Sequence, residues 1–517
     1  MVSLTIDGRQ VAVDKGTTII KAAERLGIYI PHFCYHPGLS VAANCRICLV
    51  EVEKAAKLQT ACSTPVAEGM VVRTDSERVK KARQGVMEFL LINHPLDCPI
   101  CDQAGECQLQ DYSYTYGQVS CRFGESKLHH KQRSLGEHVL LHPSRCIKCT
   151  RCIRFCQEVV GRQELTLINR SNHVEIAVFD NQPLSNDYSA NVVDLCPVGA
   201  LTLKEFRFKE RVWLLDQAES VCPSCSKGCN VLLGASGDKI LRIKPRANPA
   251  VNGYWICDYG RFNFHWVNEP GRLRSPLVKS NGRFLPVSWK EALDVVAENL
   301  RRVAEQEGPD SLVGLGTSRL TCEDAFVFVR LFQDVLMAGP VRFPPPAGRV
   351  SDLPLSQDSL LRERDNTPNY QGVVDMGMVP YTDDLLGGVK ALYVAGDFSK
   401  LPGAAQCLNK LSFLVVQELR MTETAVLAQV VLPAASFAEK EGSFTNSAGR
   451  VQMVRPVLGP LGNTRADWEI FAQVAKRLGR DFGFGGAGEV FEEISRTVPG
   501  YKGMDYQTLG SLGQIKC

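Results

Sequence analysis

Residues 94–111 have the sequence HPLDCPICDQAGECQLQD, the most specific pattern in this chain of 517 residues. Cys98, Cys101 and Cys107 offer three thiolates, and a four-iron cubane is usually held by four protein ligands. His94 lies at the end of a predicted helix, four residues before Cys98, where it can be the fourth ligand. Alternatively His94 only caps that helix, since a partly cationic ring interacts well with the carboxyl end of a helix dipole. We expect ligation, and hence a [4Fe–4S] centre whose potential is raised by the neutral imidazole.

Cysteines dominate the first half of the chain. Seventeen of the 20 cysteines lie between Cys34 and Cys257. Disulfide frameworks are typical of short secreted chains, so metal or cluster ligation is the better interpretation for a chain of this length. The amino-terminal residues show no secretory signal, and no run of 18 apolar residues predicts a membrane span. The net charge of +3, from 59 basic and 56 acidic residues, gives no case for nucleic acid or an anionic membrane.

A second cubane motif begins at residue 146. In CIKCTRCIRFC, residues 146–156, Cys146, Cys149 and Cys152 have the spacing that wraps one corner of a [4Fe–4S] cluster. Cys196, followed by proline, is the remote fourth ligand that such runs require. Four basic residues surround this run and can offset the negative charge of the cluster: Arg145, Lys148, Arg151 and Arg154. Cys156 is left without a cluster and is interpreted as a buried thiol.

The first ligand set along the chain predicts a [2Fe–2S] centre. Cys45 and Cys48 form a close pair on one loop, and Cys34 and Cys62 lie on either side. The gap of ten residues after Cys34 departs from the plant-type ferredoxin spacing. A zinc knuckle is the alternative for these four cysteines.

The last ligand set is Cys222, Cys225 and Cys229, followed by Cys257. It fits a [4Fe–4S] site with a distant fourth ligand, and zinc also fits this spacing. A small sheet is needed between them to bring Cys257 back, and residues 230–234 and 239–243 can supply its strands.

The predicted secondary structure divides the chain into two kinds of fold. Residues 2–13 predict a hairpin around Asp7-Gly8, and residues 18–26 a helix, the order of a β-grasp ferredoxin. A helix over about 78–93 would bury Val79, Ala82, Val86, Phe89 and Leu90. After about residue 270 the pattern becomes α/β, with a helix capped by Ser288, buried strands at 311–317, 391–397 and 413–417, and a last helix over roughly 465–478 capped by Thr464.

Together these motifs resemble the large iron–sulfur subunit of bacterial NADH–quinone oxidoreductase, respiratory complex I, which is the 75-kDa subunit of mitochondria. The resemblance rests on the three consecutive ligand sets of residues 1–270. Residues 271–517 resemble the molybdopterin oxidoreductase-like domain of this family through SWKEAL (288–293), VVLPAASFAEKEGSFTNSAGRVQ (430–452) and ADWEIFAQVAKRLG (466–479). The expected multidomain α+β and α/β architecture has five parts: a β-grasp [2Fe–2S] ferredoxin-type domain (1–77), a [4Fe–4S] domain with one histidine and three cysteine ligands (78–137), a ferredoxin-like [4Fe–4S] module (138–215), a molybdopterin oxidoreductase-type [4Fe–4S] domain (216–272) and a shortened molybdopterin oxidoreductase-like domain (273–517).

Two departures from the family's molybdopterin enzymes argue against a bound molybdopterin. The stretch between Val303 and Phe413 is much shorter than in those enzymes, and Tyr259 stands where they often place a lysine. The loop GSFTNSAGR (442–450), which would line a pterin in such enzymes, is therefore expected to support the fold instead.

The resemblance implies one [2Fe–2S] and two [4Fe–4S] centres on an electron path, with a third [4Fe–4S] centre at Cys222–Cys257. The chain itself would carry electrons only, as part of an NADH:quinone oxidoreductase. The implied partners are the FMN/NADH-binding subunit with its small [2Fe–2S] partner, and the quinone-side iron–sulfur subunits of the peripheral arm. The implied location is cytoplasmic and peripheral on the inner membrane, without direct membrane insertion. An alternative is the electron-transfer subunit of an NAD-linked formate dehydrogenase or hydrogenase, whose front ends share these modules.

Overall fold

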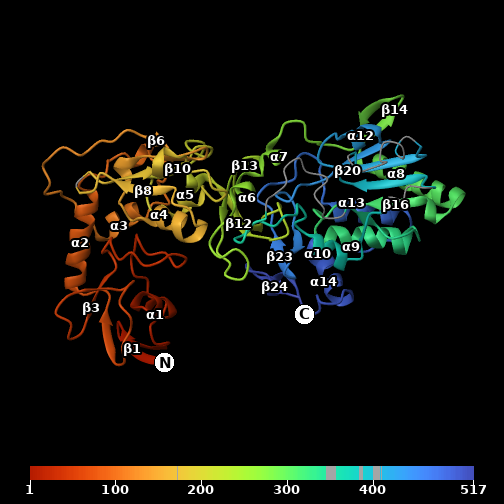
Figure 1. The fold of residues 1–517 in the computed structure, drawn as a ribbon. Helices are drawn as coiled ribbons and strands as arrows, with labels where there is room; N and C mark the ends of the chain where they lie inside the picture. Colours follow the sequence, from red (N-terminus) through yellow and green to blue (C-terminus); the bar gives the residue numbers. More distant parts are fainter. Residues whose placement is uncertain (172, 345–356, 383–387, 400–407, 409, 517) are drawn as a thin grey trace. The chain divides into compact units, whose positions relative to one another are not determined.

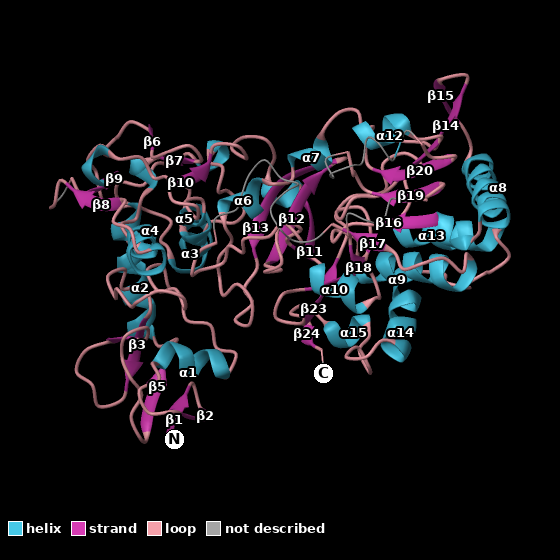
Figure 2. Ribbon diagram, turned by 45° about the vertical axis from the view of Figure 1, so that its right-hand side comes forward, coloured by secondary structure: helices cyan, strands magenta, loops and turns pink. Residues whose placement is uncertain are grey.

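The computed structural model describes the whole chain except residues 172, 345–356, 383–387, 400–407, 409 and 517 (Figure 1). It divides into two compact units, Met1–Leu215 and Asp216–Cys517, which are described separately. Figure 2 shows that helices and small sheets make up the first unit, while the second contains a large sheet with helices.

The first unit begins with the predicted β-grasp. In residues 1–77, all of which the structure describes, five strands form a sheet in the order β2-β1-β5-β3-β4. Strands β1 and β2 form the antiparallel hairpin, and β1 pairs with β5 in parallel. Asp7 and Gly8 both have positive φ, 47° and 79°, as the tight hairpin turn requires. The elements are β1 (Val2–Ile6), β2 (Arg9–Val13), α1 (Ile19–Arg25), β3 (Leu49–Val52), β4 (Gln59–Thr60) and β5 (Met70–Arg73).

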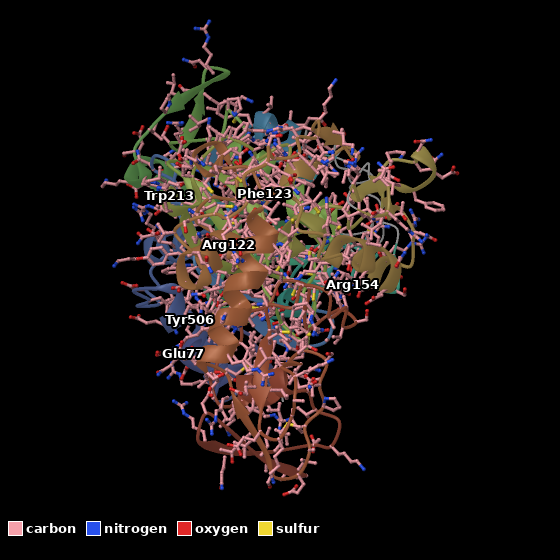
Figure 3. The ribbon with its side chains drawn as sticks, turned by 90° about the vertical axis from the view of Figure 1, so that its left-hand side faces the viewer. Glu77, Arg122, Phe123, Arg154, Trp213 and Tyr506 are labelled. Atoms are coloured by element: carbon pink, nitrogen blue, oxygen red, sulfur yellow. The ribbon has the colours of Figure 1, made fainter. Side chains whose placement is uncertain are left out.

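The long helix α2 (Glu77–Leu91) follows, and the Ser76 side chain caps its first turn. Val79 is fully buried as predicted, but Phe89 is 79% exposed, so the predicted apolar face is wrong at this position. Figure 3 shows Glu77 at one end of α2 and Arg122 near the other, where Arg122 Nε donates to Glu88 Oε1 at 2.9 Å.

The rest of the first unit consists of short elements around the cysteine loops. Strands β8 and β9 pair as an antiparallel hairpin, and β10, β7 and β6 form a small sheet. The elements are η1 (Cys98–Ile100), α3 (Gln108–Tyr116), β6 (Arg133–Ser134), β7 (Val139–Leu141), η2 (Pro143–Arg145), α4 (Arg151–Arg154), the π-helix η3 (Phe155–Val160), β8 (Leu165–Ile168), β9 (Glu175–Val178), η4 (Phe179–Asn181), α5 (Asn191–Leu195), β10 (Leu201–Leu203) and η5 (Val212–Leu214).

The second unit opens with an antiparallel sheet, β11-β12-β13. Strands β12 (Asn230–Ser236) and β13 (Lys239–Pro245) are the two predicted from the sequence, and β11 (Asp216–Val221) adds a third. Helix α6 (Asp258–Phe262), which begins directly after Cys257, and helix α7 (His265–Asn268) follow and contact β13.

An α/β sheet forms the body of the second unit. Within the described residues its strands follow the order β15-β14-β21-β20-β19-β16-β17-β18, with β16 to β21 parallel to one another. The strands are β14 (Leu277–Ser280), β15 (Arg283–Pro286), β16 (Leu312–Leu315), β17 (Arg342–Phe343), β18 (Val379–Pro380), β19 (Ala391–Ala395), β20 (Phe413–Glu418) and β21 (Val430–Pro433). A separate sheet is formed by β22 (Gly442–Thr445), β23 (Arg450–Val454) and β24 (Gln514–Ile515).

Both faces of the large sheet are covered. On one face, Tyr393 of β19 and Val415 of β20 pack in a core with α8, α9, α13 and α14. On the other face, Leu392 and Val416 pack with α12 (Figure 2). Because neighbouring residues of a strand point to opposite faces, this explains why these strands are continuously apolar. The helices and turns are α8 (Trp289–Glu307), η6 (Pro309–Ser311), α9 (Cys322–Arg330), the π-helix η7 (Leu331–Val335), α10 (Tyr370–Asp375), α12 (Glu423–Leu427), α13 (Asp467–Arg477), α14 (Ala487–Thr497) and α15 (Tyr506–Leu509).

One predicted cap is wrong. Helix α13 has Ala466 at its N-cap, not Thr464, and makes no side-chain capping bond. Thr464 is buried just before it instead. None of the helices in the described part of the chain is both long and apolar enough to cross a bilayer.

Candidate iron–sulfur cluster sites

The four thiols of the Cys34 set lie together beside the β-grasp sheet. Cys48 Sγ and Cys62 Sγ are 3.4 Å apart, and the Cys34 amide donates to Cys45 Sγ at 3.4 Å. Hydrogen bonds from Cys45 and Cys62 lower the pKa of Cys34 to about 2, and the same bonds with Cys34 raise the pKa of both partners. The structure therefore brings all four predicted residues into one site, in which negative charge on one sulfur is stabilised by its neighbours.

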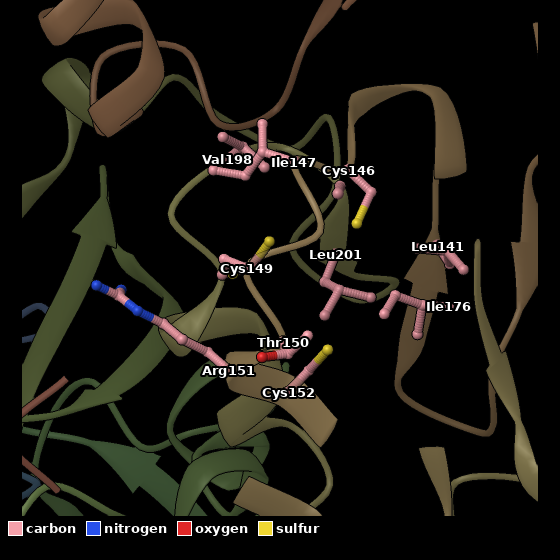
Figure 4. Close-up of a pocket in the computed structure, with 12 residues that line it drawn as sticks. Leu141, Cys146, Ile147, Cys149, Thr150, Arg151, Cys152, Ile176, Val198 and Leu201 are labelled. Carbon is pink, nitrogen blue, oxygen red and sulfur yellow. The ribbon is translucent and has the colours of Figure 1, made fainter. Parts of the chain in front are cut away.

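The four cysteines of the Cys146 set line a single apolar cavity. In Figure 4, the sulfur atoms of Cys146, Cys149 and Cys152 point toward this space, and Leu201 lies among them. Burial raises the pKa of Cys149 to about 11 and that of Cys196 to about 12. Thiols in such surroundings become thiolates at neutral pH when a metal centre is bound, so the cavity and its donors fit a cluster.

The backbone after Cys146 turns so that an amide group lies close to the Cys146 sulfur. Lys148 and Thr150 have left-handed φ angles of 56° and 63°, which fold the short gaps between the cysteines into tight turns. The Lys148 amide donates to Cys146 Sγ at 3.4 Å. Amide-to-sulfur hydrogen bonds of this kind tune the potential of a cluster.

The His94 set lies at the end of α2. Cys101 and Cys107 are buried and Cys98 is exposed. Burial raises the pKa of Cys107 to about 11 and lowers the pKa of His94 to about 4. The His94 ring is therefore neutral at physiological pH, the form in which imidazole binds a metal.

The alternative role of His94, as a cationic cap, is not supported by these contacts. The carboxyl end of α2 is capped by Lys127, whose Nζ donates to the carbonyls of Leu91 and Ile92 at 2.7 and 2.9 Å. A neutral imidazole also gains little from the helix dipole, because that interaction needs positive charge near the last carbonyls.

The His94 and Cys146 sets share their surroundings. The amide of Gln108, next to Cys107, donates to the carbonyl of Pro197, next to Cys196, at 3.1 Å. Gly199 approaches Cys101 so closely that a Cβ on Gly199 would clash with the Cys101 sulfur. One apolar cluster, which includes Phe33, Leu109 and Val198, contains Cys107, and partly buried cysteines of the other two sets in this unit pack against it: Cys45, Cys146 and Cys196.

All four cysteines of the Cys222 set are buried in the second unit. The Cys222 amide donates to the Cys229 carbonyl at 2.9 Å, which closes the ligand loop. Cys257 is the N-cap of α6 and accepts a hydrogen bond at Sγ from the Gly260 amide at 3.3 Å. A Cβ on Gly260 would lie 2.9 Å from Cys222 Sγ and 3.5 Å from Cys257 Sγ, so both sulfurs lie beside this glycine. Burial raises the pKa of Cys225 to about 12.

The hairpin β22–β23 holds this ligand loop. The Ser447 amide donates to the Ser226 carbonyl at 2.8 Å, Asn446 Nδ2 to the Lys227 carbonyl at 3.1 Å, and Gln452 Nε2 to the Gly228 carbonyl at 2.9 Å. Ser447 and Asn446 of the GSFTNSAGR segment thus bind the ligand loop of the Cys222 set.

Gly199 and Gly260, the glycines that admit the sulfurs, were not predicted from the sequence. Their signal was local: each follows a predicted ligand by three residues, in CPVG and in CDYG. Among the described residues, no three His, Cys, Asp or Glu side chains are close enough to hold a single metal ion.

Comparison with known families covers most of the chain. The matched descriptions are "2Fe-2S iron-sulfur cluster binding domain" (1–77), "NADH-ubiquinone oxidoreductase-G iron-sulfur binding region" (83–120), "NADH-quinone oxidoreductase subunit 3, ferredoxin-like domain" (136–202), "Molybdopterin oxidoreductase Fe4S4 domain" (217–269) and "Molybdopterin oxidoreductase" (272–342 and 365–477). The expected fold class, with domains of the [2Fe–2S] and [4Fe–4S] kinds before a molybdopterin-type domain, is confirmed.

Comparison with individual proteins agrees. The G subunit of NADH-quinone oxidoreductase from Rickettsia conorii is 43% identical over 333 residues, which are 64% of this chain and 49% of that protein, so this match spans about half of the relative. The crystal structure of an NAD+-reducing [NiFe]-hydrogenase in the H2-reduced state matches with a TM-score of 0.38 and 28% identity, over 41% of this chain and 91% of that chain.

Two mitochondrial relatives match over nearly the whole chain. The iron-sulfur protein 1 of NADH dehydrogenase [ubiquinone] from Solanum tuberosum is 31% identical over 96% of this chain and 83% of its own length. The 78 kDa subunit of NADH-ubiquinone oxidoreductase from Neurospora crassa is 31% identical over 99% of this chain and 86% of its own length. The chain therefore belongs to the family formed by the G subunit of bacterial NADH–quinone oxidoreductase and the mitochondrial 75-kDa subunit.

Proposed function

We propose that this chain is the iron–sulfur electron-transfer subunit of an NADH:quinone oxidoreductase. The observation that carries the proposal is the apolar cluster that contains Cys107 and against which cysteines of the two other ligand sets pack. Sites that pack against one apolar core can exchange electrons where the access of water and oxygen is restricted. The bound clusters supply one-electron oxidation and reduction, and the protein supplies their spacing and their potentials.

The proposed occupants are one [2Fe–2S] cluster and three [4Fe–4S] clusters. Sixteen side chains would hold them: Cys34, Cys45, Cys48 and Cys62 for the first, His94, Cys98, Cys101 and Cys107 for the second, Cys146, Cys149, Cys152 and Cys196 for the third, and Cys222, Cys225, Cys229 and Cys257 for the fourth. The neutral His94 ring, the cavity lined by the Cys146 set and the closed Cys222 loop support these assignments.

The proposed direction of transfer is from the Cys34 site to the Cys146 site and then to the His94 site. Hydrogen bonds join the ligand loops at both steps. Arg154 Nη2 donates to the carbonyls of Cys34 and Cys149 at 2.6 and 3.4 Å, and the Gln108 amide donates to the Pro197 carbonyl. The protein thus provides short covalent and hydrogen-bonded paths between neighbouring sites.

For the molybdopterin-type domain we propose a supporting role without a pterin. Ser443, Thr445 and Asn446, from the segment that would line a pterin, are buried and bonded to protein groups, among them Glu323 and Tyr501. Through β22 and β23 this domain fixes the loop of the Cys222 set.

The proposed partners follow from the family. An FMN- and NADH-binding subunit with its small [2Fe–2S] partner would supply electrons, and quinone-side iron–sulfur subunits of the peripheral arm would accept them. The chain would then lie on the cytoplasmic side of the membrane as a peripheral component of the complex.

The experiment is an iron and sulfide determination with EPR-monitored redox titration of the full-length protein. We expect about 14 iron atoms per chain, two from the [2Fe–2S] centre and four from each cubane. The exposed Cys121 offers a matched control: Cys121→Ser should keep every signal, whereas Cys107→Ser should lose one cubane signal. Stoichiometric zinc without acid-labile sulfide would reject the proposal.

A further inference from the structure

Two buried arginines stand between the Cys34 and Cys146 sets. Arg151 and Arg154 are at the two ends of α4 and are only 6% and 8% exposed. In Figure 4 the Arg151 side chain points away from the cavity that the Cys146 set lines. Arg154 is labelled in Figure 3. Since residues three apart share a helix face, both guanidinium groups can reach the same neighbouring loop.

Each guanidinium donates to backbone carbonyls of both ligand loops. Arg151 Nη2 donates to the Tyr35 carbonyl at 2.5 Å and Nη1 to the Leu195 carbonyl at 3.2 Å, so it joins the residue after Cys34 to the residue before Cys196. Arg154 Nη2 donates to the carbonyl of Cys34 at 2.6 Å and lies 3.4 Å from that of Cys149. The two arginines therefore bind ligand residues, or their direct neighbours, in both sets.

Neither guanidinium is neutralised by a carboxylate. Within the described part of the chain, no ion pair involves Arg151 or Arg154. Arg145, which directly precedes Cys146, does form an ion pair, with Asp97. The Arg154 guanidinium also donates to the Ser40 carbonyl. The Glu158 carboxylate accepts a hydrogen bond from the Ser40 amide at 2.8 Å and forms no ion pair with Arg154. A buried charge without a counter-ion is costly unless negative charge is supplied close by.

The residues that these arginines contact belong to, or adjoin, the ligands on which negative charge would arise when clusters are bound. A four-cysteine iron–sulfur site carries net negative charge, and each electron received adds one more unit.

We infer that Arg151 and Arg154 form one cationic bridge that is shared by the Cys34 and Cys146 centres. The bridge raises the midpoint potentials of both centres and links their ligand loops. This rests on the proposed function, because it needs clusters at both sites. The arginines are positioning residues, since they act through the ligand loops. Because the charge is shared, loss of one arginine should disfavour reduction of both centres, although they are held in different domains.

The test is an EPR-monitored redox titration of the full-length protein with its clusters. In Arg154→Gln we expect reduction of both the Cys34 and the Cys146 centre to be weakened roughly tenfold, with both midpoint potentials shifted downward. The signal of the His94 centre should stay in place, because Arg145, a buried arginine that influences this set, is paired with Asp97 and is left unchanged. Arg154→Lys keeps the charge and should keep both potentials near those of the wild type.

Arg162→Gln is the matched control, since that side chain is 62% exposed and screened by water, and no potential should move. No shift in Arg154→Gln, or a shift at one centre only, would overturn the inference. If the Gln variants of Arg151 and Arg154 lose iron while their Lys variants keep it, the need for charge is supported. If the Lys variants lose iron as well, the arginines are structural and the inference fails. A wild type without the two signals would instead reject the proposed function.

Discussion

Arg145 and Asp97 form an ion pair, with 2.5 Å between Nη2 and Oδ2, and each residue directly precedes the first cysteine of a different ligand set. Arg145 is 3% exposed and Asp97 22% exposed in their side chains. The pair therefore fixes the start of the Cys146 loop to the start of the Cys98 loop. If either Arg145 or Asp97 lost its partner, the remaining residue would be a mostly buried, uncompensated charge.

The ion pair leads to a prediction about the stability of the first unit. Asp97→Asn should destabilise the first unit by about 3 kcal/mol, because Arg145 stays buried without its counter-ion. Denaturant unfolding followed by the visible absorbance of the clusters measures this loss. The exposed pair of Arg73 and Glu53, in the same unit, is the control, since Glu53→Gln should cost well under about 1 kcal/mol. Equal effects of both substitutions would contradict the importance of burial at Asp97.

The ligand role of His94 predicts the outcome of two substitutions. His94→Cys should retain a cluster and lower its potential, because a thiolate adds negative charge where the imidazole had none. His94→Ala should lose the signal of this centre or change its shape. Both are measured by EPR with redox titration. An unchanged signal and midpoint in both variants would remove His94 from the ligands and leave it only a packing role.

Gly199 and Gly260 predict losses that are specific to one centre. In Gly199→Ala the new methyl group would clash with Cys101 Sγ, and in Gly260→Ala it would lie 2.9 Å from Cys222 Sγ. We expect the first variant to lose the His94 centre and the second to lose the Cys222 centre, with the other EPR signals intact. Gly85→Ala on α2, where no atom lies within 4 Å, should keep all signals and gain about 0.5–1 kcal/mol in stability. A full set of EPR signals in all three variants would contradict the prediction, because it would show that the ligand loops can shift to make room for the added methyl group.

Local patterns in the sequence predicted those parts of the fold that depend on nearby residues. Asp7-Gly8 can adopt the positive φ angles of a hairpin turn, and the alternation in residues 230–245 gives β12 and β13. The cysteine spacings placed thiols on short loops, where the structure brings them together. In each case the deciding interaction spans only a few residues.

The contacts between distant residues were not predictable in this way. Arg154 and Cys34 are 120 residues apart, and no local pattern tells which carbonyls a buried guanidinium will meet. Lys127 caps α2 from 36 residues away, although the sequence offered His94 as the nearer candidate. Phe89 has the spacing of a buried residue but is exposed, because helical periodicity does not show which neighbours cover a face.

The molybdopterin-type domain contains a buried carboxyl group that is not among the proposed cluster ligands. Glu323, on α9, accepts hydrogen bonds from the Ser443 amide and hydroxyl, both at 2.8 Å, and from the Tyr506 hydroxyl at 2.9 Å. Burial outweighs these bonds and raises the pKa of Glu323 to about 7. Glu418, on β20, has its pKa raised to about 7, also mainly by burial.

These two carboxyl groups predict that the second unit loses stability as pH rises from about 4.5 to 7. In that window the unfolded chain ionises while the folded chain keeps the protons, so the unfolded state binds fewer protons and the free energy of unfolding falls. Above pH 7 the loss is complete, on the order of 3 kcal/mol for Glu323. Urea unfolding at several pH values measures the slope, and Glu323→Gln should remove about half of it, leaving the part due to Glu418. Glu291→Gln, at an exposed position of α8, is the control and should leave the slope unchanged. A slope that is the same in wild type and Glu323→Gln would show that this carboxyl titrates alike in the folded and unfolded chain.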